Sequence, residues 1–324
     1  MKIPFAEPNL GQKEAEYLNQ AINSGWIGGT GDFIDRFEAK FAKYIGVEYA
    51  ITCSSGTTAL MLAYHACGMN ASAKVVVPDT TFIATVNMAR MFTADINLHE
   101  VDNETWTLPL KDLKANYAVG VHLYGNPCDM GDIYRNKFTF IEDCAQSLGS
   151  KFKGKMTGSF GLASCFSFHS AKTITTGEGG MVCTNNETVA KRVRHLKNHS
   201  MVEPYKHDTI GYNCRMTNLQ ASIGLAQLER IDELTDKKRS ITKYYEENLS
   251  KSFIRQKEQR NSKLVKWANA FKHPCSKEIR QQLFKSHIET RPGFLGDDTI
   301  VLPCSTKLTS TDLSYIVSTL NTYA

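Results

Sequence analysis

Short apolar segments that alternate with helix-length segments are the feature that most restricts the fold of this 324-residue chain. A series of apolar, often β-branched runs is predicted to form strands, at residues 50–53, 74–78, 95–98, 117–123, 138–143, 165–168 and 180–184. Helix-length segments separate most of these runs, which is the pattern of βαβ units. We therefore predict an α/β fold with a mostly parallel central sheet flanked by helices on both faces. Ligands of such sheets bind at the carboxyl ends of the strands.

Helical patterns flank this region. Apolar residues at helical spacing predict helices at residues 12–22 and 33–44, before the first strand. A longer helical pattern covers residues 218–249 and suggests an element that connects two domains. We predict a large domain of residues 1–235 and a smaller C-terminal α+β domain of residues 236–324.

Composition narrows the classes of partner. The net charge is +5 and the charged residues are mostly scattered, which favours a solvated surface over a nucleic-acid interface. The nine cysteines include no CxxC pair and no zinc-like spacing, so we expect free thiols in a reducing compartment and no metal site. No stretch approaches the roughly 20 apolar residues that a membrane span requires. We expect a cytoplasmic protein that binds neither nucleic acid nor membrane.

The first candidate binding motif is the Ser55-Gly56-Thr57 segment, which follows a predicted strand and begins a predicted helix. Small residues allow an anion to approach the backbone, and the helix N-terminus supplies free amides and a positive dipole. The segment can therefore hold a phosphate group. An ordinary helix N-cap formed by Ser or Thr explains the same residues equally simply.

The second candidate motif is the Glu142-Asp143 pair, at the carboxyl end of an apolar predicted strand. A carboxylate in that position can keep the ring nitrogen of a cofactor protonated. Catalytic or metal-binding carboxylates end strands in many other folds, so this motif alone does not select a function. His122 lies within another apolar strand, and we interpret it as a structural histidine.

The third candidate motif is the segment from Cys165 to Gly180, which contains Lys172. A lysine that is partly removed from water near a phosphate site has a lowered pKa and can act as a nucleophile toward an aldehyde. Most lysines, however, are solvated surface groups. Spacing alone does not select Lys172 over the other lysines.

The order of these motifs along the chain resembles the DegT/StrS family of nucleotide-sugar aminotransferases. The resemblance runs from about residue 7 to residue 231, and its motifs are Ser55-Gly56-Thr57, Pro78 to Phe82, Val121 to Gly125, Glu142-Asp143, Ser167 to Lys172, Gly177 to Gly180 and Gly211 to Arg215. It implies the fold type I of enzymes that depend on pyridoxal 5′-phosphate (PLP), as in aspartate aminotransferase.

The resemblance also implies roles for individual residues. Lys172 is expected to form the imine with PLP and to transfer protons, and Asp143 to pair with the pyridine nitrogen. The other expected cofactor-binding residues are Ser55, Gly56, Thr57, Phe82, Gln146, Ser167 and, from the neighbouring subunit, Asn213. A homodimer with shared active sites follows from this last expectation.

Within the family, the segment around Lys172 and the opening segment through Gly31 most resemble the GDP-perosamine synthases. These enzymes transfer the amino group of L-glutamate to C4 of GDP-4-keto-6-deoxymannose, a step toward surface polysaccharides such as the O-antigen of lipopolysaccharide. The residues expected to bind the nucleotide-linked keto sugar are Trp26, Ile27, Gly31 and His169. For His169, a packing role is equally compatible with the sequence.

Other functions compete with this interpretation. An aminotransferase for a UDP- or dTDP-linked 3- or 4-keto sugar would keep the same machinery and change only the acceptor. A PLP-dependent dehydratase of the same family has histidine in place of the lysine, so Lys172 argues against it. A non-catalytic regulator with this fold is disfavoured by the presence of both Lys172 and Asp143. The Gly29-Thr30-Gly31 segment does not follow a strand, which disfavours a nicotinamide-dependent oxidoreductase.

Overall fold

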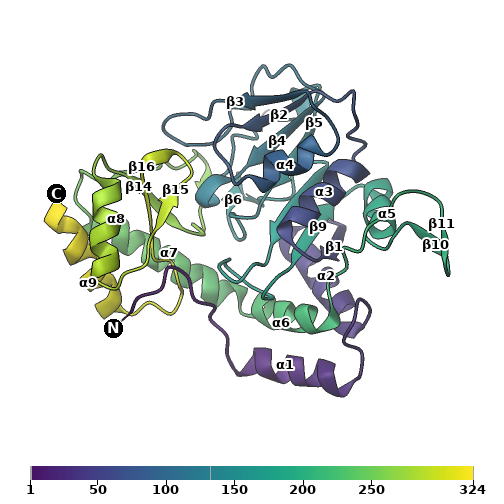
Figure 1. Ribbon diagram of the computed structural model, residues 1–324, viewed down its shortest axis with the longest axis horizontal. Helices are drawn as coiled ribbons and strands as arrows, with labels where there is room; N and C mark the ends of the chain where they lie inside the picture. The colour runs from purple at the N-terminus through teal and green to yellow at the C-terminus, as the bar shows by residue number, and fades with distance from the viewer. Residues whose placement is uncertain (1, 132, 324) are drawn as a thin grey trace.

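The computed structural model describes residues 2–131 and 133–323, and its central feature is a seven-stranded sheet (Figure 1). The strand order is β1-β9-β8-β5-β4-β2-β3. The strands are β1 (Tyr49–Cys53), β2 (Val75–Pro78), β3 (Ile96–His99), β4 (Tyr117–Val121), β5 (Thr139–Asp143), β8 (Ala163–Ser167) and β9 (Gly180–Thr184). β9 runs antiparallel to its two neighbours, β1 and β8, and all the other neighbouring pairs in this sheet are parallel. The predicted α/β fold with a mostly parallel sheet is confirmed.

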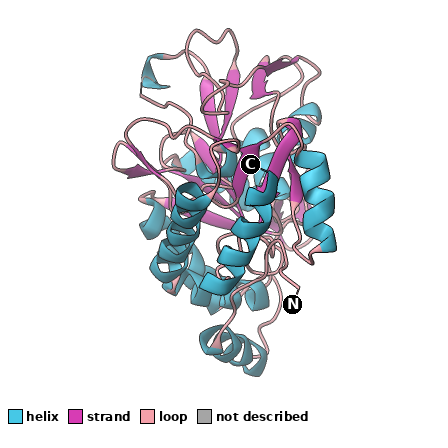
Figure 2. Cartoon of the chain, turned by 90° about the vertical axis from the view of Figure 1, so that its left-hand side faces the viewer, coloured by secondary structure: helices cyan, strands magenta, loops and turns pink. Residues whose placement is uncertain are grey.

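Helices cover both faces of this sheet, because successive side chains of each buried strand point to opposite sides. On one face Ile51 and Val182 pack with residues of α3 (Gly56–Ala66) and α5 (Glu187–Leu196). On the other face Met181 packs with α2 (Asp32–Ile45) and α6 (Asn218–Glu229). Figure 2 shows the resulting layers of helix and strand. The remaining helices of this part are α1 (Gln12–Asn23), which contacts α6, and α4 (Ala84–Arg90).

The antiparallel strand β9 lies between β1 and β8 and begins at their carboxyl ends. Its first residue, Gly180, lies in register with Cys53 at the end of β1 and with Ser167 at the end of β8. A Cβ atom on Gly180 would lie only 2.3 Å from the carbonyl oxygen of Ser55, so this close approach requires glycine. The end of the connection between β8 and β9, which contains Lys172, therefore lies beside the Ser55-Gly56-Thr57 segment.

A second core forms around a four-stranded antiparallel sheet with the order β12-β14-β16-β15. Its core also includes Ile3, which pairs with Ile288. The elements of this part are β12 (Ile254–Arg255), β14 (Asn269–Lys272), β15 (Arg291–Gly293), β16 (Gly296–Leu302), α8 (Ser276–Lys285) and α9 (Ser310–Leu320). The N-terminal segment thus packs against the C-terminal part of the chain, which the sequence did not indicate. The predicted domain boundary near residue 235 stays a prediction.

The single helix predicted over residues 218–249 is wrong, because the chain forms two helices that meet at Arg230. α6 ends at Glu229, and α7 runs over Ile231–Asn248 toward the C-terminal part (Figure 1). The amide of Arg230 donates to the carbonyl of Gln227, which tightens the last turn of α6. The guanidinium group of Arg230 also pairs with Glu14 of α1 and Glu233 of α7, which holds the break in place.

Several short elements differ from the prediction. The predicted strand 117–123 is too long: β4 ends at Val121, and Tyr124 adopts a left-handed conformation with φ 55° in a 3-10 turn. Other short elements were not predicted, and they are β6 (Lys151–Phe152), β7 (Lys155–Met156), β10 (Met201–Glu203), β11 (Lys206–His207), β13 (Ser262–Lys263) and the 3-10 turns Leu123–Gly125, Ile133–Arg135 and Asn321–Tyr323. Strands of two or three residues carry too little periodicity to be recognised in a sequence.

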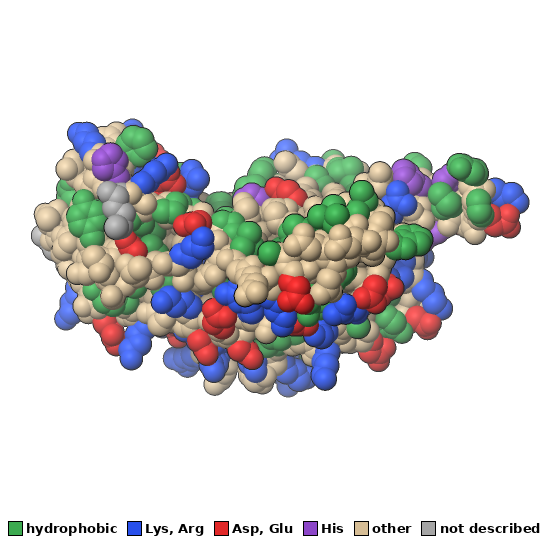
Figure 3. Space-filling model, turned by 90° about the horizontal axis from the view of Figure 1, so that it is seen from below, with side chains coloured by type: hydrophobic (Ala, Val, Ile, Leu, Met, Phe, Trp, Pro, Cys, Tyr) green, Lys and Arg blue, Asp and Glu red, His purple; other side chains and the backbone are tan. Residues whose placement is uncertain are grey.

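The β10–β11 hairpin projects from the body of the molecule at the right of Figures 1 and 3. Its exposed side chains include Val202 and Tyr205. Seen from below, the surface dips between the C-terminal lobe at the left and the larger lobe at the right (Figure 3). In the described part of the chain, no helix has both the length and the apolar character needed to cross a bilayer.

Candidate active site

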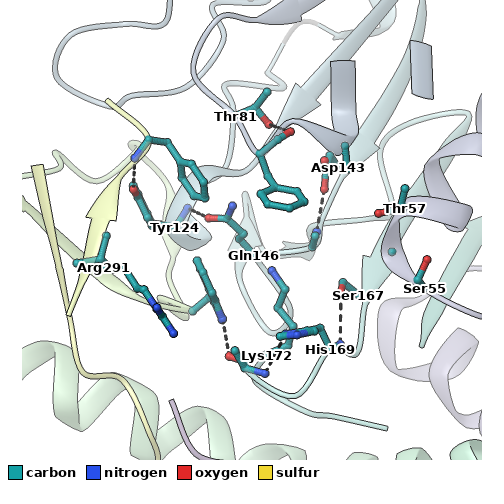
Figure 4. A pocket seen from close by; sticks show the side chains of 18 of the residues that line it. Ser55, Thr57, Thr81, Tyr124, Asp143, Gln146, Ser167, His169, Lys172 and Arg291 are labelled. Atoms are coloured by element: carbon teal, nitrogen blue, oxygen red, sulfur yellow. Dashed lines mark hydrogen bonds between the residues drawn. The ribbon is translucent and has the colours of Figure 1, made fainter. Parts of the chain in front are cut away.

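A cavity of about 500 Å³ lies at the carboxyl ends of β1, β5 and β8, and the C-terminal part of the chain closes it (Figure 4). Most of the predicted site residues line it, namely Ser55, Gly56, Thr57, Phe82, Asp143, Gln146, Ser167, His169 and Lys172. Motifs that are more than 100 residues apart in the sequence therefore meet in one place. Such a convergence of polar groups in an apolar cavity is typical of a cofactor site.

The phosphate-type loop joins β1 to the start of α3. Ser55 is the N-cap of α3, since its hydroxyl accepts a hydrogen bond from the amide of Thr58 at 3.1 Å. The first amides of a helix have no partner within the helix, so those of Gly56 and Thr57 can bind an anion. A Cβ atom on Gly56 would lie 2.7 Å from the Cβ of Ser167, so only glycine fits between the two strand ends. The loop is thus an N-cap whose first amides are free to bind an anion.

The two acidic residues at the end of β5 point to opposite sides of the sheet. The Asp143 carboxylate lines the cavity and accepts hydrogen bonds from the hydroxyl of Thr85 at 2.8 Å and the amide of Ala145 at 3.1 Å. Asp143 is 5% exposed, so its carboxylate is fixed where few water molecules reach it. The Glu142 carboxylate points away from the cavity and is fully buried.

The carboxylate of Glu142 is held by backbone amides and by His122, which indicates a structural role. Its carboxylate accepts hydrogen bonds from the amides of Gly158, Phe160 and Gly161 at 2.7 to 2.8 Å. His122 Nε2 lies 3.0 Å from the same carboxylate, and His122 Nδ1 accepts a hydrogen bond from the amide of Cys128. Because an amide can only donate, the proton of a neutral His122 ring lies on Nε2. Both ring nitrogens are therefore bonded, as the structural interpretation of His122 requires.

Lys172 enters the cavity from the connection between β8 and β9. Figure 4 shows its side chain directed into the same space as Asp143 and Gln146. Burial lowers the pKa of the Lys172 ammonium from 10.5 to about 8; Asp143 opposes this effect, and the cation of Lys238 adds to it. The Nζ atom lies 4.2 Å from the centroid of the Trp267 ring. A lysine with this pKa has a useful fraction of neutral, nucleophilic amine near neutral pH.

Two further predicted residues lie on the cavity wall beside Lys172. Gln146 is 5% exposed, and its side-chain oxygen accepts a hydrogen bond from the amide of Tyr124 at 2.8 Å. The ring of Phe82 is 55% exposed and lies at the cavity mouth, 6.4 Å from the ring of Phe294. An exposed aromatic ring at the edge of a cavity is available to stack on a flat ligand.

His169 lies on the same wall. Its Nδ1 atom accepts a hydrogen bond from the amide of Ala171, and its Nε2 atom lies 3.8 Å from a carboxylate oxygen of Glu178. Both His169 and Glu178 line the cavity and are exposed. The ring therefore presents its Nε2 edge to a ligand and to Glu178.

The remaining predicted residues lie outside this cavity. Trp26 and Ile27 are exposed at 63% and 51%, on the loop between α1 and α2. Gly31 in the same loop lies against Asn218, where a Cβ atom would be 2.4 Å from the side chain. Asn213 is exposed and accepts a hydrogen bond from Arg215. Their roles stay predictions, and for Asn213 the predicted role belongs to the site of another subunit.

The opposite wall of the cavity was not predicted. It is formed by residues of the N-terminal segment, the turn after β4 and the C-terminal part, which are Phe5, Tyr124, Trp267, Arg291, Pro292, Phe294 and Val301. Tyr124 stacks on Phe294 with ring centroids 5.6 Å apart, and the Tyr124 hydroxyl accepts a hydrogen bond from the Phe294 amide. Apart from Tyr124, which lies in the Val121 to Gly125 motif, no local motif marks these residues, because long-range packing brings them to the cavity.

The comparisons with known proteins decide the family. The model of the DegT/DnrJ/EryC1/StrS aminotransferase family matches residues 8–296. The chain belongs to this family. Members of the family are PLP-dependent aminotransferases of nucleotide sugars, and PLP is the cofactor of this enzyme.

Curated relatives agree with this assignment. The GDP-perosamine synthase of Escherichia coli O157:H7 is 43% identical over 308 residues, which cover 90% of this chain and 84% of that protein. The GDP-perosamine synthase of Vibrio cholerae is 40% identical and covers 76% of this chain and 71% of that protein.

Solved structures confirm the fold. A putative sugar aminotransferase from Streptococcus pneumoniae in its PMP form superposes with a TM-score of 0.92 at 24% identity, covering 99% of this chain and 97% of that chain. An aminotransferase from Psychrobacter cryohalolentis superposes with a TM-score of 0.89 at 25% identity, covering 99% and 98% of the two chains. The predicted PLP fold type I is confirmed.

Proposed function

We propose that this aminotransferase transfers the amino group of L-glutamate to C4 of GDP-4-keto-6-deoxymannose and so forms GDP-perosamine for surface polysaccharide. One observation carries the choice of acceptor. Three relatives named GDP-perosamine synthase are 40–43% identical to this chain. Relatives named as transaminases of UDP-linked sugars are 31–35% identical, over a similar or smaller part of the chain.

The residues of the cavity fit PLP, and we assign each a contact. The amides at the start of α3, with the hydroxyls of Thr57 and Ser167, bind the phosphate, and glycine at residue 56 allows the helix start to lie close to Ser167. Asp143 holds the pyridine nitrogen protonated. The ring of Phe82 covers one face of the cofactor, and Gln146 contacts its edge.

When bound, PLP supplies an aldehyde that takes up the amino group and a ring that delocalises negative charge. The chain itself supplies the base. The lowered pKa of Lys172 provides a neutral amine near neutral pH, which removes the α-proton of glutamate. In the second half-reaction Lys172 returns a proton to C4 of the sugar. His169 and the loop containing Trp26, Ile27 and Gly31 contact the nucleotide sugar.

The proposal includes a homodimer in the cytoplasm. Asn213, Trp26 and Ile27 are exposed and lie outside the cavity of their own chain, so they are available to the site of a second copy. The projecting β10–β11 hairpin with exposed Val202 and Tyr205 provides apolar surface for the same contact. Among the described residues all nine cysteines are free thiols, which suits a reducing compartment.

The test is an acceptor panel. The PLP-loaded enzyme is incubated with L-glutamate and, separately, GDP-4-keto-6-deoxymannose, a UDP-linked and a dTDP-linked 4-keto sugar, and a UDP-linked 3-keto sugar. Formation of 2-oxoglutarate is followed in each case. We expect the GDP-linked acceptor to give the largest kcat/KM. A larger value with a UDP- or dTDP-linked sugar would refute the acceptor, and turnover of none would support a regulatory protein with this fold.

A further inference from the structure

Trp267 lies just before β14, in the C-terminal part of the chain, and contacts the segment of the large sheet's part that contains Lys172. Its indole Nε1 donates a hydrogen bond to the carbonyl of Ala171 at 2.6 Å. Its ring face lies under the Lys172 Nζ atom, 4.2 Å from the ring centroid. A cation over an indole face at this distance is in the range of a favourable cation–π interaction. Trp267 thus contacts both the backbone and the side chain of the lysine segment.

Lys238 of α7 holds the backbone of Trp267 by a hydrogen bond. The Lys238 Nζ atom donates hydrogen bonds to the carbonyls of Trp267 at 2.9 Å and Cys304 at 2.6 Å. Lys238 is 4% exposed, so a buried cation ties α7 to the two C-terminal segments that flank the cavity. The ring of Phe5 packs edge-on against Trp267, with centroids 6.3 Å apart. The indole therefore has a defined position before any ligand binds.

We propose that Trp267 is a positioning residue for Lys172: the indole face holds the amine of Lys172 whenever that amine is free, and Lys238 keeps the indole in place. This inference rests on the proposed role of Lys172 as the base. A free lysine side chain has many rotamers, and a catalytic base must stay within reach of the carbon whose proton it moves. The proton that leaves the donor carbon makes the amine an ammonium, and the indole face stabilises that positive charge.

The charged and titratable groups around Lys172 come from several elements. Those that act on its pKa are Asp143 of β5, Lys238 of α7 and Cys304 after β16. The other charged or titratable groups that line the cavity are Tyr124, His169, Glu178 and Arg291. A substitution of Trp267 removes the indole and none of these groups. A change in how the reactivity of Lys172 depends on pH in such a variant is therefore due to loss of the ring.

The test uses two substitutions of one residue. Trp267→Phe keeps an aromatic face and loses the indole donor, whereas Trp267→Leu loses both. The coenzyme is removed from each protein, and the rate at which PLP recombines with Lys172 is followed by absorbance as a function of pH. The indole ring favours the ammonium form of Lys172, so its loss should lower the pKa of Lys172. We therefore expect the rising, acidic part of the rate–pH profile to lie about half a pH unit lower in Trp267→Leu than in the wild type. The rate–pH profile of Trp267→Phe should coincide with that of the wild type.

The second measurement is the half-reaction of the PLP-loaded protein with L-glutamate in a single turnover. We expect Trp267→Leu to slow it about 10- to 100-fold and Trp267→Phe less than about fivefold, with coenzyme retained by both. Lys238→Met, which loses both hydrogen bonds to carbonyls, should give an intermediate rate.

The outcomes separate this inference from the proposed function. Lack of any response of the wild type to glutamate would refute the proposed donor, and the recombination profiles would still decide the role of Trp267. Unchanged profiles in Trp267→Leu, or equal defects in the Phe and Leu variants, would overturn the inference. Slowing that only follows loss of coenzyme would assign Trp267 a purely structural role and would overturn it as well.

Discussion

The two walls of the cavity are built differently. The wall at the strand ends consists of short polar side chains fixed by nearby hydrogen bonds, as with Asp143, Gln146 and Ser55. The opposite wall consists mainly of aromatic rings and one exposed cation, Arg291. The ends of a few strands of one sheet form the first wall. The second wall is formed by segments from both ends of the chain.

The difference suggests a division of labour. Fixed polar groups suit a ligand that must be held in one geometry, which here is the coenzyme. Aromatic faces and a flexible guanidinium group suit the acceptor, because they tolerate small shifts of a ligand. Substitutions in the first wall, and at Trp267, which contacts Lys172 from the second wall, should therefore change chemistry. The other substitutions in the second wall should change substrate binding.

The largest expected effect belongs to Lys172 in the first wall. Lys172→Ala removes the proposed base and should lower kcat by about 10³-fold or more, while PLP is still retained by the phosphate loop. Lys155→Ala, at an exposed lysine of β7, is the matched control and should leave kcat unchanged. Activity retained by Lys172→Ala would remove the basis for assigning chemistry to this wall.

The adjacent carboxylates of β5 give the next test. In Asp143→Asn the amide oxygen still accepts from the Ala145 amide, and the NH2 group donates to the Thr85 hydroxyl, which now accepts. The charge is lost, so we expect kcat to fall about 100-fold with little change in stability. Glu142→Gln instead disrupts the buried bonds to backbone amides and His122, which should lower the free energy of unfolding by about 3 kcal/mol.

Both variants are compared by steady-state kinetics and by chemical denaturation of the PLP-loaded protein. The expected pattern is a loss of catalysis at residue 143 and a loss of stability at residue 142. The reverse pattern would show that the orientation of the two side chains has been assigned to the wrong faces of the sheet.

The pH dependence of coenzyme attachment tests whether the pKa of Lys172, in the first wall, is lowered by burial. Burial lowers the pKa of Lys172 to about 8, so below that pH the neutral amine falls about tenfold per pH unit. The rate of PLP attachment to coenzyme-free protein should rise with pH up to about 8 and then level off. A rate that still rises toward pH 10 would mean that the amine behaves as an ordinary solvated lysine.

The smallest expected effect belongs to Arg291 in the second wall. Arg291→Met removes an exposed guanidinium group near the cavity, and exposed ion pairs contribute little, so KM for the anionic nucleotide sugar should rise about fivefold. We expect kcat to stay within about twofold. The control Arg255→Met, at another exposed arginine, should change neither constant. A large loss of kcat in Arg291→Met would break the proposed division between the walls.

The predictability of the site follows the same division. The first wall could be predicted, because Ser55, Asp143 and Ser167 each stand at a strand end and the strands have clear apolar patterns. The resemblance then selected Lys172 among many lysines. The structure added that Glu142 and Asp143 face opposite sides, which follows from strand alternation once the strand is known.

The second wall could not be predicted from local patterns. Trp267 and Phe294 lie in short segments without periodicity, and contacts across the whole chain bring them to the cavity. The break at Arg230 was missed for a similar reason. Its residues are good helix formers, and the pairing of Arg230 with Glu14 depends on tertiary structure.

The most direct test of the account is to locate the covalent bond between the coenzyme and the chain. The PLP-loaded protein is reduced with borohydride and digested, and the modified peptide is identified by mass spectrometry. We predict that the modification lies on Lys172. Modification of another lysine, such as Lys238 on the neighbouring helix, or the absence of any modified lysine, would contradict the account.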